Sequence, residues 1–299
     1  MEDVVIIGGG PAGLTAAIYI QRAGKHAVVL EGNAPGGQII NAAEVQNFPS
    51  IKSISGVDFA QNLYEQALSL GAEVRFVKAV GIEIKEDKKI VKTTKQDIEA
   101  KAIILATGAS NKKLGVEREN EFLGKGVSYC ATCDGAFFKK KDVAVVGGGN
   151  TAVEDALFLS NYCNKVYLIH RRDFFRAEET FVEQIKKKEN VEFVLNSTVT
   201  KLVGDKVLEE IEVTDNNKNT RNIKVSGLFI AVGQVPGNGA FENLIKLDNF
   251  GYIVAQENCK TNIDGIFVAG DARTKQVRQL TTACSDGTTA AIAAVNYIK

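Results

Sequence analysis

The amino-acid sequence predicts an α/β fold in which one β-α-β unit occurs twice. The first copy begins with the apolar run Val4–Ile7 and the glycine-rich turn G-G-G-P-A-G at residues 8–13. The second begins with the apolar run Val143–Val146 and the turn G-G-G-N-T-A at residues 147–152. Short, wholly apolar strands are typical of parallel sheets that are buried on both faces. The repeat therefore indicates two folding units of similar architecture.

The first turn leads into a helical pattern over Leu14–Ala23, and its glycine spacing is typical of dinucleotide binding. The glycines at G-x-G-x-x-G spacing are Gly8, Gly10 and Gly13. They permit a tight turn, close approach of the backbone to a pyrophosphate, and close packing of helix on strand. The helix N-terminus supplies N–H donors for phosphate. The second apolar strand, Ala27–Leu30, ends at Glu31, whose carboxylate can hydrogen-bond the ribose hydroxyls. Together these features favour a dinucleotide site over a plain β-α-β unit.

Later segments extend this first unit. Gly36-Gly37-Gln38 forms a second glycine-rich loop, residues 59–70 read as an amphipathic helix, and residues 73–91 read as antiparallel strands with a charged turn at 85–89. An apolar strand then ends in A-T-G at 106–108, where Thr107 and Gly108 can touch a nucleotide. A last buried strand ends at Gly270-Asp271, the end of a strand at which such sheets hold ligands. A helix of small residues follows, and its N-terminus can stabilise negative charge.

The second unit differs from the first at the position expected to contact the ribose. The repeat aligns Glu31 with His170, at the end of the apolar strand Lys165–Ile169. Three arginines follow, namely Arg171, Arg172 and Arg176. An acid at this position favours a free 2′-hydroxyl, whereas cations favour a 2′-phosphate. The second site is therefore expected to prefer NADPH to NADH. The alternative is an ordinary solvated basic patch.

A C-x-x-C motif lies between the two turns, in the segment Tyr129–Phe138. Its cysteines, Cys130 and Cys133, are followed at once by Asp134. Such a pair can hold a metal, lock a fold or shuttle electrons. No second C-x-x-C or histidine pair lies nearby, so a zinc site would lack ligands and we expect no metal. Between two nucleotide motifs, the pair is expected to carry electrons, with Asp134 as the proton carrier for a neighbouring thiol.

The composition is that of a soluble globular chain of two domains. The 299 residues include 36 basic and 36 acidic side chains, which gives no electrostatic reason to expect a nucleic-acid or membrane partner. No apolar run reaches the roughly 18 residues that span a bilayer, and the N-terminus shows no signal-peptide pattern. The five cysteines do not make a secreted disulfide scaffold, so we expect a cytoplasmic protein.

Taken together, these motifs closely resemble those of the low-molecular-weight, bacterial-type thioredoxin reductases, over essentially the whole chain. The most specific motif is C-A-T-C-D-G at 130–135, and H-R-R-D-F-F-R at 170–176 and R-Q-L-T-T-A at 278–283 support it. The resemblance implies two Rossmann-like domains, an FAD domain at 1–112 and 240–299 and an inserted NADPH domain at 113–239. It also implies a homodimer in which NADPH reduces FAD, FAD reduces the Cys130–Cys133 disulfide, and the dithiol reduces thioredoxin or a thioredoxin-like protein. In this family the second cysteine, here Cys133, lies against the flavin.

The resemblance and the motifs assign site residues to each cofactor. The expected FAD-binding residues are Gly8, Gly10, Pro11, Ala12, Gly13, Glu31, Gly36, Gly37, Gln38, Asn47, Thr107, Gly108, Gly270, Asp271, Arg278, Gln279 and Leu280. The expected NADPH-binding residues are Gly147, Gly149, Asn150, Thr151, Ala152, His170, Arg171, Arg172 and Arg176. Leu280 stands where many members of the family carry alanine. Hinges are expected near residues 112–115 and 233–239, where Gly237-Asn238-Gly239 is suited to bending.

Two alternatives remain open at this point. A dithiol oxidase would reoxidise its flavin with O₂, and a non-catalytic redox sensor would merely bind nucleotides. A flavin-linked ferredoxin reductase of similar build would lack the C-x-x-C motif. A ferredoxin-driven thioredoxin reductase would lose the arginine motif after His170, which is intact here.

Overall fold

The computed structural model describes residues 1–85 and 88–299, which divide into two compact units. Unit 1 comprises Met1–Ser110 with Val235–Lys299, and unit 2 comprises Asn111–Gln234. This division confirms the α/β fold in which a discontinuous unit holds the other as an insertion. The chain passes from one unit to the other between residues 110 and 111 and between residues 234 and 235, a few residues before the boundaries expected from the sequence. Both passages fall in short strands that pair with each other, β7 (Ala109–Asn111) and β16 (Gln234–Pro236).

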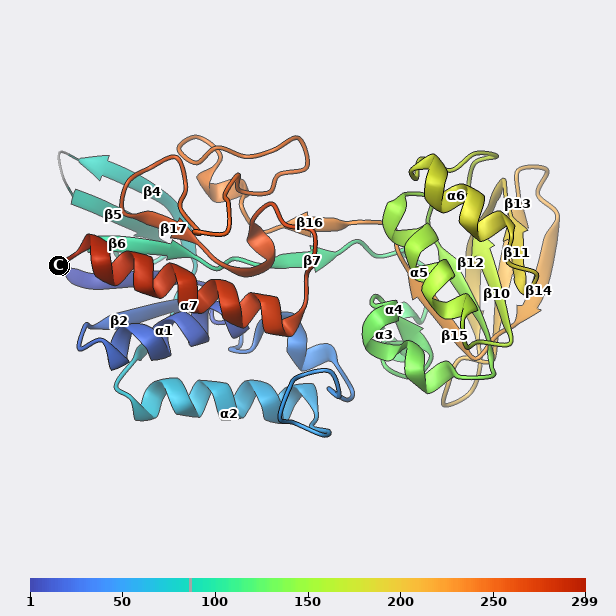
Figure 1. The fold of residues 1–299 in the computed structure, drawn as a ribbon, viewed down its shortest axis with the longest axis horizontal. Helices are drawn as coiled ribbons and strands as arrows, with labels where there is room; N and C mark the ends of the chain where they lie inside the picture. Colours follow the sequence, from blue (N-terminus) through green and yellow to red (C-terminus); the bar gives the residue numbers. More distant parts are fainter. Residues whose placement is uncertain (86–87) are drawn as a thin grey trace. The chain divides into compact units, whose positions relative to one another are not determined.

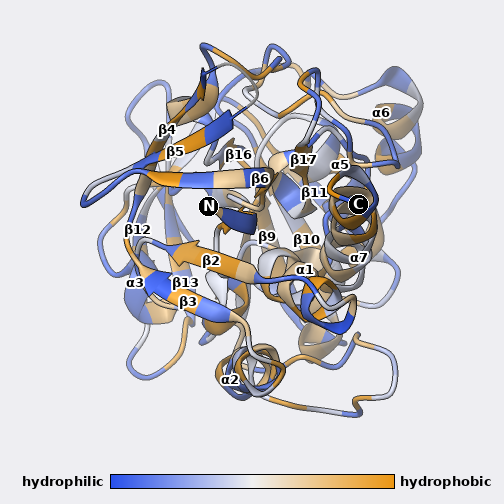
Figure 2. Ribbon diagram, turned by 90° about the vertical axis from the view of Figure 1, so that its left-hand side faces the viewer, coloured by the Kyte–Doolittle hydropathy of each residue, from blue (hydrophilic) through white to orange (hydrophobic). Residues whose placement is uncertain are grey.

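Unit 1 is built on a seven-stranded sheet in the order β3-β2-β1-β6-β5-β4, with β17 pairing to β6 (Figure 1). Its strands are β1 (Glu2–Ile7), β2 (Ala27–Glu31), β3 (Glu73–Phe76), β4 (Ala79–Lys85), β5 (Lys88–Thr93), β6 (Ile98–Leu105) and β17 (Ile266–Val268). The apolar strand β1 is central, with Val4 paired to Ala27 of β2 and to Ala102 of β6. Strand β2 is hydrophobic over most of its length (Figure 2).

One strand of this sheet corrects the prediction for residues 73–91. Strands β4 and β5 are antiparallel, as expected, but β3 pairs parallel to β2. The reason is that helix α2 (Gly56–Ser69) lies between β2 and β3 in the chain, and a crossover through a helix brings the next strand in parallel. The charged turn expected at 85–89 includes residues 86–87, which lie outside the described residues.

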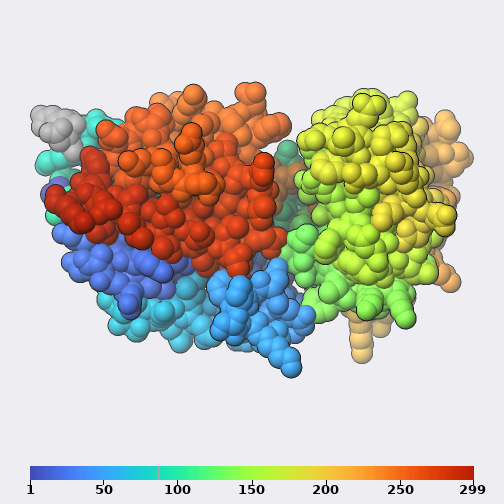
Figure 3. Space-filling view, in the orientation of Figure 1, coloured from blue at the N-terminus to red at the C-terminus, as the bar shows by residue number. Residues whose placement is uncertain are grey.

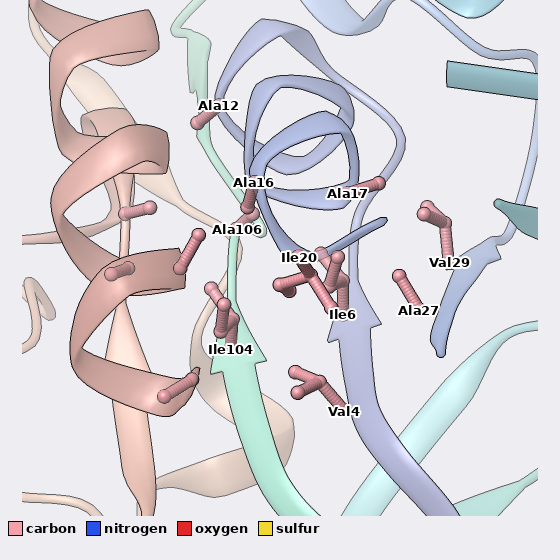
Figure 4. Packing of buried hydrophobic residues seen from close by; sticks show 14 of the residues in the cluster. Val4, Ile6, Ala12, Ala16, Ala17, Ile20, Ala27, Val29, Ile104 and Ala106 are labelled. Atoms are coloured by element: carbon pink, nitrogen blue, oxygen red, sulfur yellow. The ribbon is translucent and has the colours of Figure 1, made fainter. Parts of the chain in front are cut away.

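Helices α1 (Pro11–Arg22) and α7 (Leu280–Tyr297) pack on each other beside the sheet through small side chains. A Cβ at Gly287 of α7 would lie 2.3 Å from the carbonyl oxygen of Ala12, so only glycine permits this approach. Under α1, Ile20 packs close to Ile6 of β1 (Figure 4). The outer side of α7, drawn in red, forms part of the surface of unit 1 (Figure 3). The short 3₁₀ turns of this unit are η1 (Gly37–Asn41), η3 (Gly239–Phe241) and η4 (Gly270–Ala272).

A buried charge cluster ties α7 to the loop after β17. The carboxylate of Asp286, on α7, accepts hydrogen bonds from Arg273 Nε at 2.9 Å, Lys275 Nζ at 2.8 Å and the N–H of Gly270 at 3.0 Å. The Asp286 and Arg273 side chains are only 6% and 2% exposed. Burial alone would raise the Asp286 pKa, but the hydrogen bonds from Arg273 and Lys275 outweigh it and hold the pKa below its usual value. Asp286 therefore fixes the start of η4.

Replacing Asp286 with alanine is expected to lower the free energy of unfolding by about 3–5 kcal/mol, because it leaves Lys275 without its carboxylate and Arg273 with only the exposed Glu257. Urea unfolding followed by circular dichroism measures this loss. The pKa of Asp286 is lower in the folded state than in the unfolded state. Its contribution to stability is therefore fully present above the pKa of the unfolded state and is lost as the pH falls through the pKa of the folded state. The exposed Asp264→Asn change in the same unit is the control. A loss at Asp286 no larger than that control would contradict this account.

Unit 2 repeats the β-α-β arrangement on a parallel five-stranded sheet in the order β11-β10-β9-β15-β8. A separate antiparallel sheet, β12-β13-β14, is inserted in the sequence between β11 and β15. The parallel strands are β8 (Val127–Ser128), β9 (Asp142–Val146), β10 (Lys165–Ile169), β11 (Val191–Val194) and β15 (Gly227–Ile230). The antiparallel strands are β12 (Ser197–Val203), β13 (Glu210–Asp215) and β14 (Thr220–Lys224). The helical segments are α3 (Glu119–Phe122), α4 (Ala131–Asp134), η2 (Gly135–Phe138), α5 (Asn150–Ser160) and α6 (Glu179–Lys186). Within the described ranges, no helix of either unit is long and apolar enough to cross a membrane.

Candidate functional site

The glycine turn of unit 1 packs closely on two sides and is open on a third. Gly8 has φ +113°, and a Cβ there would lie 2.3 Å from the carbonyl oxygen of Ala106. A Cβ at Gly13 would lie 1.9 Å from the Gly8 carbonyl oxygen, so helix and turn are in direct contact. At Gly10, by contrast, the nearest described atom to a Cβ is the Cα of Gly37, at 3.7 Å. The turn thus combines two crowded glycines with one open face, and Pro11 begins α1 immediately behind it.

Glu31 lies beside this turn, as the sequence predicted. Its Oε2 accepts the N–H of Gly9 at 2.8 Å, and its Oε1 accepts the N–H of Asn33 at 2.8 Å. These two backbone bonds hold the carboxylate at the end of β2. Each carboxylate oxygen can accept more than one hydrogen bond, so both oxygens can still bind a ribose hydroxyl.

Loops far apart in the sequence bring the remaining unit 1 candidates together. Asn47 donates a hydrogen bond to Gln279 at 3.2 Å, although 232 residues separate them. Gln279 also forms a capping box with Thr282 at the start of α7, where Leu280 is the first helical residue. Gly36 and Gly37 both have positive φ, at +111° and +60°, and lead into η1, which contains Gln38. A Cβ at Gly270 would lie 2.9 Å from the Cβ of Ala12, so η4 contacts the start of α1.

Two buried polar atoms in unit 1 have no hydrogen-bond partner among the described residues. They are Oδ1 of Asp271 and Nε of Arg278. Burial raises the pKa of Asp271, with Lys275 and Arg278 opposing the rise. The Arg278 guanidinium stacks 4.1 Å from the centre of the Tyr252 ring, which orients it. Buried polar groups in native proteins are nearly always paired, so a polar ligand is the natural partner for both atoms.

Asn238 is a residue whose role the sequence did not reveal. It is 1% exposed, accepts a hydrogen bond from Thr107 Oγ1 at 2.7 Å, and donates to the carbonyls of Gly251 and Ala272 at 2.9 and 2.8 Å. The sequence indicated a hinge at this position because glycines flank it. The structure shows Asn238 as a buried crosslink inside unit 1. It orients Thr107 and leaves Gly108, with φ +64°, open to a ligand.

The glycine turn of unit 2 is also crowded on one side and open on the other. A Cβ at Gly147 would lie 2.3 Å from the Ala231 carbonyl oxygen and 2.6 Å from the Cβ of Ala152, whereas no described atom lies within 4 Å of a Cβ at Gly149. Asn150 begins α5 and makes two hydrogen bonds with Glu178. Its side-chain oxygen accepts the Glu178 N–H at 2.8 Å, and its side-chain nitrogen donates to the Glu178 carboxylate at 2.9 Å. Thr151, the next residue, is exposed.

His170 and the arginines that follow it occupy different environments. The His170 ring is 6% exposed and lies directly beneath Gly148, where a Cβ would come within 2.1 Å of it. Burial lowers the pKa of His170, and Arg176, Arg172 and Arg171 lower it further. The three arginines are themselves exposed. The N–H of Arg176 donates to the Gly148 carbonyl at 2.7 Å, so the arginine loop folds back onto the turn. The charges therefore stand at the rim of the glycine turn, and His170 supports the turn from below.

The C-x-x-C motif forms the start of helix α4. Cys130 is the N-cap residue and is joined to Cys133 by a disulfide, with a Cα–Cα distance of 5.3 Å. The N–H of Cys133 donates to Cys130 Sγ at 3.2 Å. Cys133 is exposed and Cys130 is half-buried. Cys133, the exposed residue of the pair, lies within the single turn of α4.

Asp134 lies half-buried directly behind the pair. Burial raises the pKa of this carboxyl, and a hydrogen bond from Ser128 at 2.6 Å opposes the rise. The strand that enters the motif is also anchored, because Tyr129 donates to Glu119 at 2.5 Å. Glu119, which is 4% exposed, accepts the N–H groups of Leu114 and Gly115 as well. Neither Ser128 nor Glu119 was identified from the sequence, where each is a single polar residue with no motif of its own.

Known proteins are similar to this chain over nearly its whole length. A family profile described as pyridine nucleotide-disulphide oxidoreductase matches residues 2–287. A thioredoxin reductase of Listeria monocytogenes is 44% identical over 99% of this chain and 94% of that protein. One from Peptoclostridium acidaminophilum is 41% identical over 99% of this chain and 97% of its own. The crystal structure of thioredoxin reductase from Streptococcus pyogenes superimposes with a TM-score of 0.96 at 38% identity, covering 99% of this chain and 98% of that one.

Proposed function

This chain belongs to the pyridine nucleotide-disulphide oxidoreductases, and we propose that it is a thioredoxin-disulfide reductase that takes its electrons from NADPH. The observation that carries this function is the Cys130–Cys133 disulfide, with one exposed cysteine, in the same unit as the arginine loop. Two relatives that share nearly the whole chain, from Listeria monocytogenes and Peptoclostridium acidaminophilum, are named thioredoxin reductase. The substrate is accordingly the disulfide of thioredoxin or of a thioredoxin-like protein.

FAD is the flavin that we propose for unit 1. Its pyrophosphate would face Gly10 and the N-terminus of α1, its ribose would meet Glu31, and Asp271 and Arg278 would offer their unpaired polar atoms. When bound, FAD would supply a two-electron carrier between a nicotinamide and a disulfide. Other residues of the chain hold the binding loops in place. Asn238 accepts a hydrogen bond from Thr107, and Asp286 accepts one from the N–H of Gly270.

NADPH is the nucleotide that we propose for unit 2, because three exposed arginines stand at the rim of its glycine turn. Replacing Arg171 and Arg172 together with glutamine should raise the KM for NADPH far more than the KM for NADH, since only NADPH carries a 2′-phosphate. Each lost charge-assisted contact is worth about 1.5–3 kcal/mol, or roughly ten- to hundredfold. Steady-state kinetics at fixed ionic strength measures both constants. Arg221→Gln, an exposed arginine of the same unit that pairs with Glu192, is the control. Equal changes in the two constants would refute the assignment.

The chain's own chemistry is dithiol–disulfide exchange. In the reduced state, one cysteine thiolate attacks a sulfur of the thioredoxin disulfide, forming a mixed disulfide and releasing one thioredoxin thiolate. The second cysteine, as a thiolate, then attacks the sulfur of the first, which restores the Cys130–Cys133 bond and releases the second thioredoxin thiolate. Two electrons leave the chain in this exchange, and its two thiol protons end on thioredoxin.

Asp134 is the group that we propose to move these protons. It follows Cys133 directly, and burial holds its pKa above that of an ordinary aspartate. A carboxyl whose pKa is raised holds its proton more readily than an ordinary aspartate, which suits acid–base catalysis of thiol exchange.

A homodimer in the cytoplasm completes the proposal. The resemblance to the family supports the dimer, and an exchanging dithiol suits a reducing compartment. Sedimentation of the purified protein measures its oligomeric state directly.

Anaerobic turnover tests the function as a whole. Beyond the NADPH that reduces its own flavin and disulfide, protein purified with FAD should consume NADPH only when oxidised thioredoxin is present, one NADPH for each thioredoxin disulfide. NADPH consumption that requires O₂ would instead indicate a dithiol oxidase. A chain that binds nucleotides and consumes no NADPH with either acceptor would be a redox sensor.

A further inference from the structure

Ser128 connects Asp134 to the backbone of the C-x-x-C motif. It ends strand β8, two residues before Cys130, and is 3% exposed. Its hydroxyl accepts the N–H of Cys130 at 3.0 Å. The same hydroxyl lies 2.6 Å from Asp134 Oδ2 and 3.4 Å from the carbonyl oxygen of Cys130. One buried oxygen therefore contacts both the proposed proton carrier and the residue that begins the redox motif.

A serine hydroxyl has a single proton, so Ser128 can donate it either to Asp134 Oδ2 or to the Cys130 carbonyl, while its oxygen still accepts the Cys130 N–H. When Asp134 is ionised, the hydroxyl donates to Oδ2 and the carbonyl of Cys130 loses that donor. When Asp134 carries a proton, the carboxyl can donate to the serine oxygen, and the serine proton is free to turn to the Cys130 carbonyl. Rotation of one O–H bond thus gives each protonation state of Asp134 its own hydrogen-bond arrangement at Cys130.

We propose that Ser128 is a positioning residue that couples the protonation state of Asp134 to the backbone of Cys130 during thiol exchange. This inference rests on the proposed reductase function. It adds to that function a residue that holds Asp134 in place and stabilises its ionised form. The cysteines remain the groups that react.

Two features of its surroundings set the direction of the Asp134 pKa, namely burial and the hydrogen bond from Ser128. Burial raises the Asp134 pKa, and the hydrogen bond from Ser128 lowers it. The titratable groups on the elements packed around α4 are Tyr129 and Glu119 before it, Lys139, Lys140 and Lys141 after it, and Glu154, Asp155, Tyr162 and Cys163 on and after α5. Among these, burial raises the pKa of Asp155 to about 7, so an inflection caused by Asp155 must be distinguished from one caused by Asp134.

Ser128→Ala tests the proposal through pH profiles. Because the variant removes the donor that favours the ionised carboxylate, the Asp134 inflection should move to higher pH by about one to two pH units. Two readouts are used, namely thioredoxin reduction by the holoenzyme and alkylation of the reduced Cys130–Cys133 dithiol by iodoacetamide. The second readout does not depend on thioredoxin, so it tests Ser128 even if the proposed reductase function fails.

A double-mutant cycle separates coupling from a structural defect. In an Asp134→Asn background, Ser128→Ala should cause no further shift in either profile. Ser160→Ala, at a buried serine of α5 that donates to the Leu157 carbonyl, should leave the profiles unchanged. Asp155→Asn identifies the inflection that belongs to Asp155. Profiles of Ser128→Ala that overlay those of the unmodified protein would overturn the proposal, and so would a shift of equal size in the Asp134→Asn background.

Discussion

Changing either Cys130 or Cys133 to serine is expected to abolish thioredoxin reduction. A serine cannot form the second disulfide bond that releases thioredoxin from the mixed disulfide, so neither single variant can complete the exchange. Oxidation of NADPH by a small artificial electron acceptor should continue in both variants, because it does not need the dithiol. Paired assays with thioredoxin and with the artificial acceptor measure the two activities on the same preparation.

The control for this experiment is Cys163→Ser. Cys163 is buried in the same unit and lies outside the motif, so this variant should keep both activities. Serine variants of Cys130 and Cys133 that both still reduce thioredoxin would show that the C-x-x-C motif is structural.

Asp134→Asn is expected to slow thioredoxin reduction by about 10²–10⁴-fold, the range for loss of a general acid–base group. In the unmodified protein the protonated carboxyl is lost as the pH rises through its raised pKa, so the acid-dependent step should slow over that interval. The asparagine variant should lack this limb of the pH profile. Stopped-flow measurement of the exchange step across pH provides both the rate and the profile.

Asp155→Asn is the matched control, because it removes another carboxyl whose pKa is raised by burial in the same unit. An Asp134→Asn protein that exchanges thiols as fast as this control would exclude Asp134 from proton transfer.

The sequence predicted those features that depend on short stretches of chain. The two glycine turns, the acid at the end of β2 and the position of the C-x-x-C motif each follow from a local pattern whose geometry few residues can meet. Glu31 lies beside Gly9, as the β-α-β spacing required. The arginine loop after β10 also returns to its turn, through Arg176 and Gly148.

Features that depend on distant segments were not predictable in this way. Asn238 stands between two glycines and indicates flexibility in the sequence, yet contacts with Thr107, Gly251 and Ala272 bury it. The alignment placed His170 opposite Glu31, and its ring lies beneath Gly148 as Glu31 lies beside Gly9, but the burial of the ring was not predicted. One signal was available in the sequence. A lone aspartate, Asp286, within a helix of mostly small residues requires a buried cation nearby, and Arg273 and Lys275 are those cations.

A single anaerobic experiment tests most directly whether electrons pass from NADPH through the flavin and the Cys130–Cys133 dithiol to thioredoxin. NADPH is added to the holoprotein without oxygen, the flavin absorbance is followed, and oxidised thioredoxin is then added. The account predicts that NADPH bleaches the flavin and that thioredoxin restores its colour while gaining two thiols per molecule. A flavin that stays bleached with excess thioredoxin, and recovers only when oxygen is admitted, would contradict it.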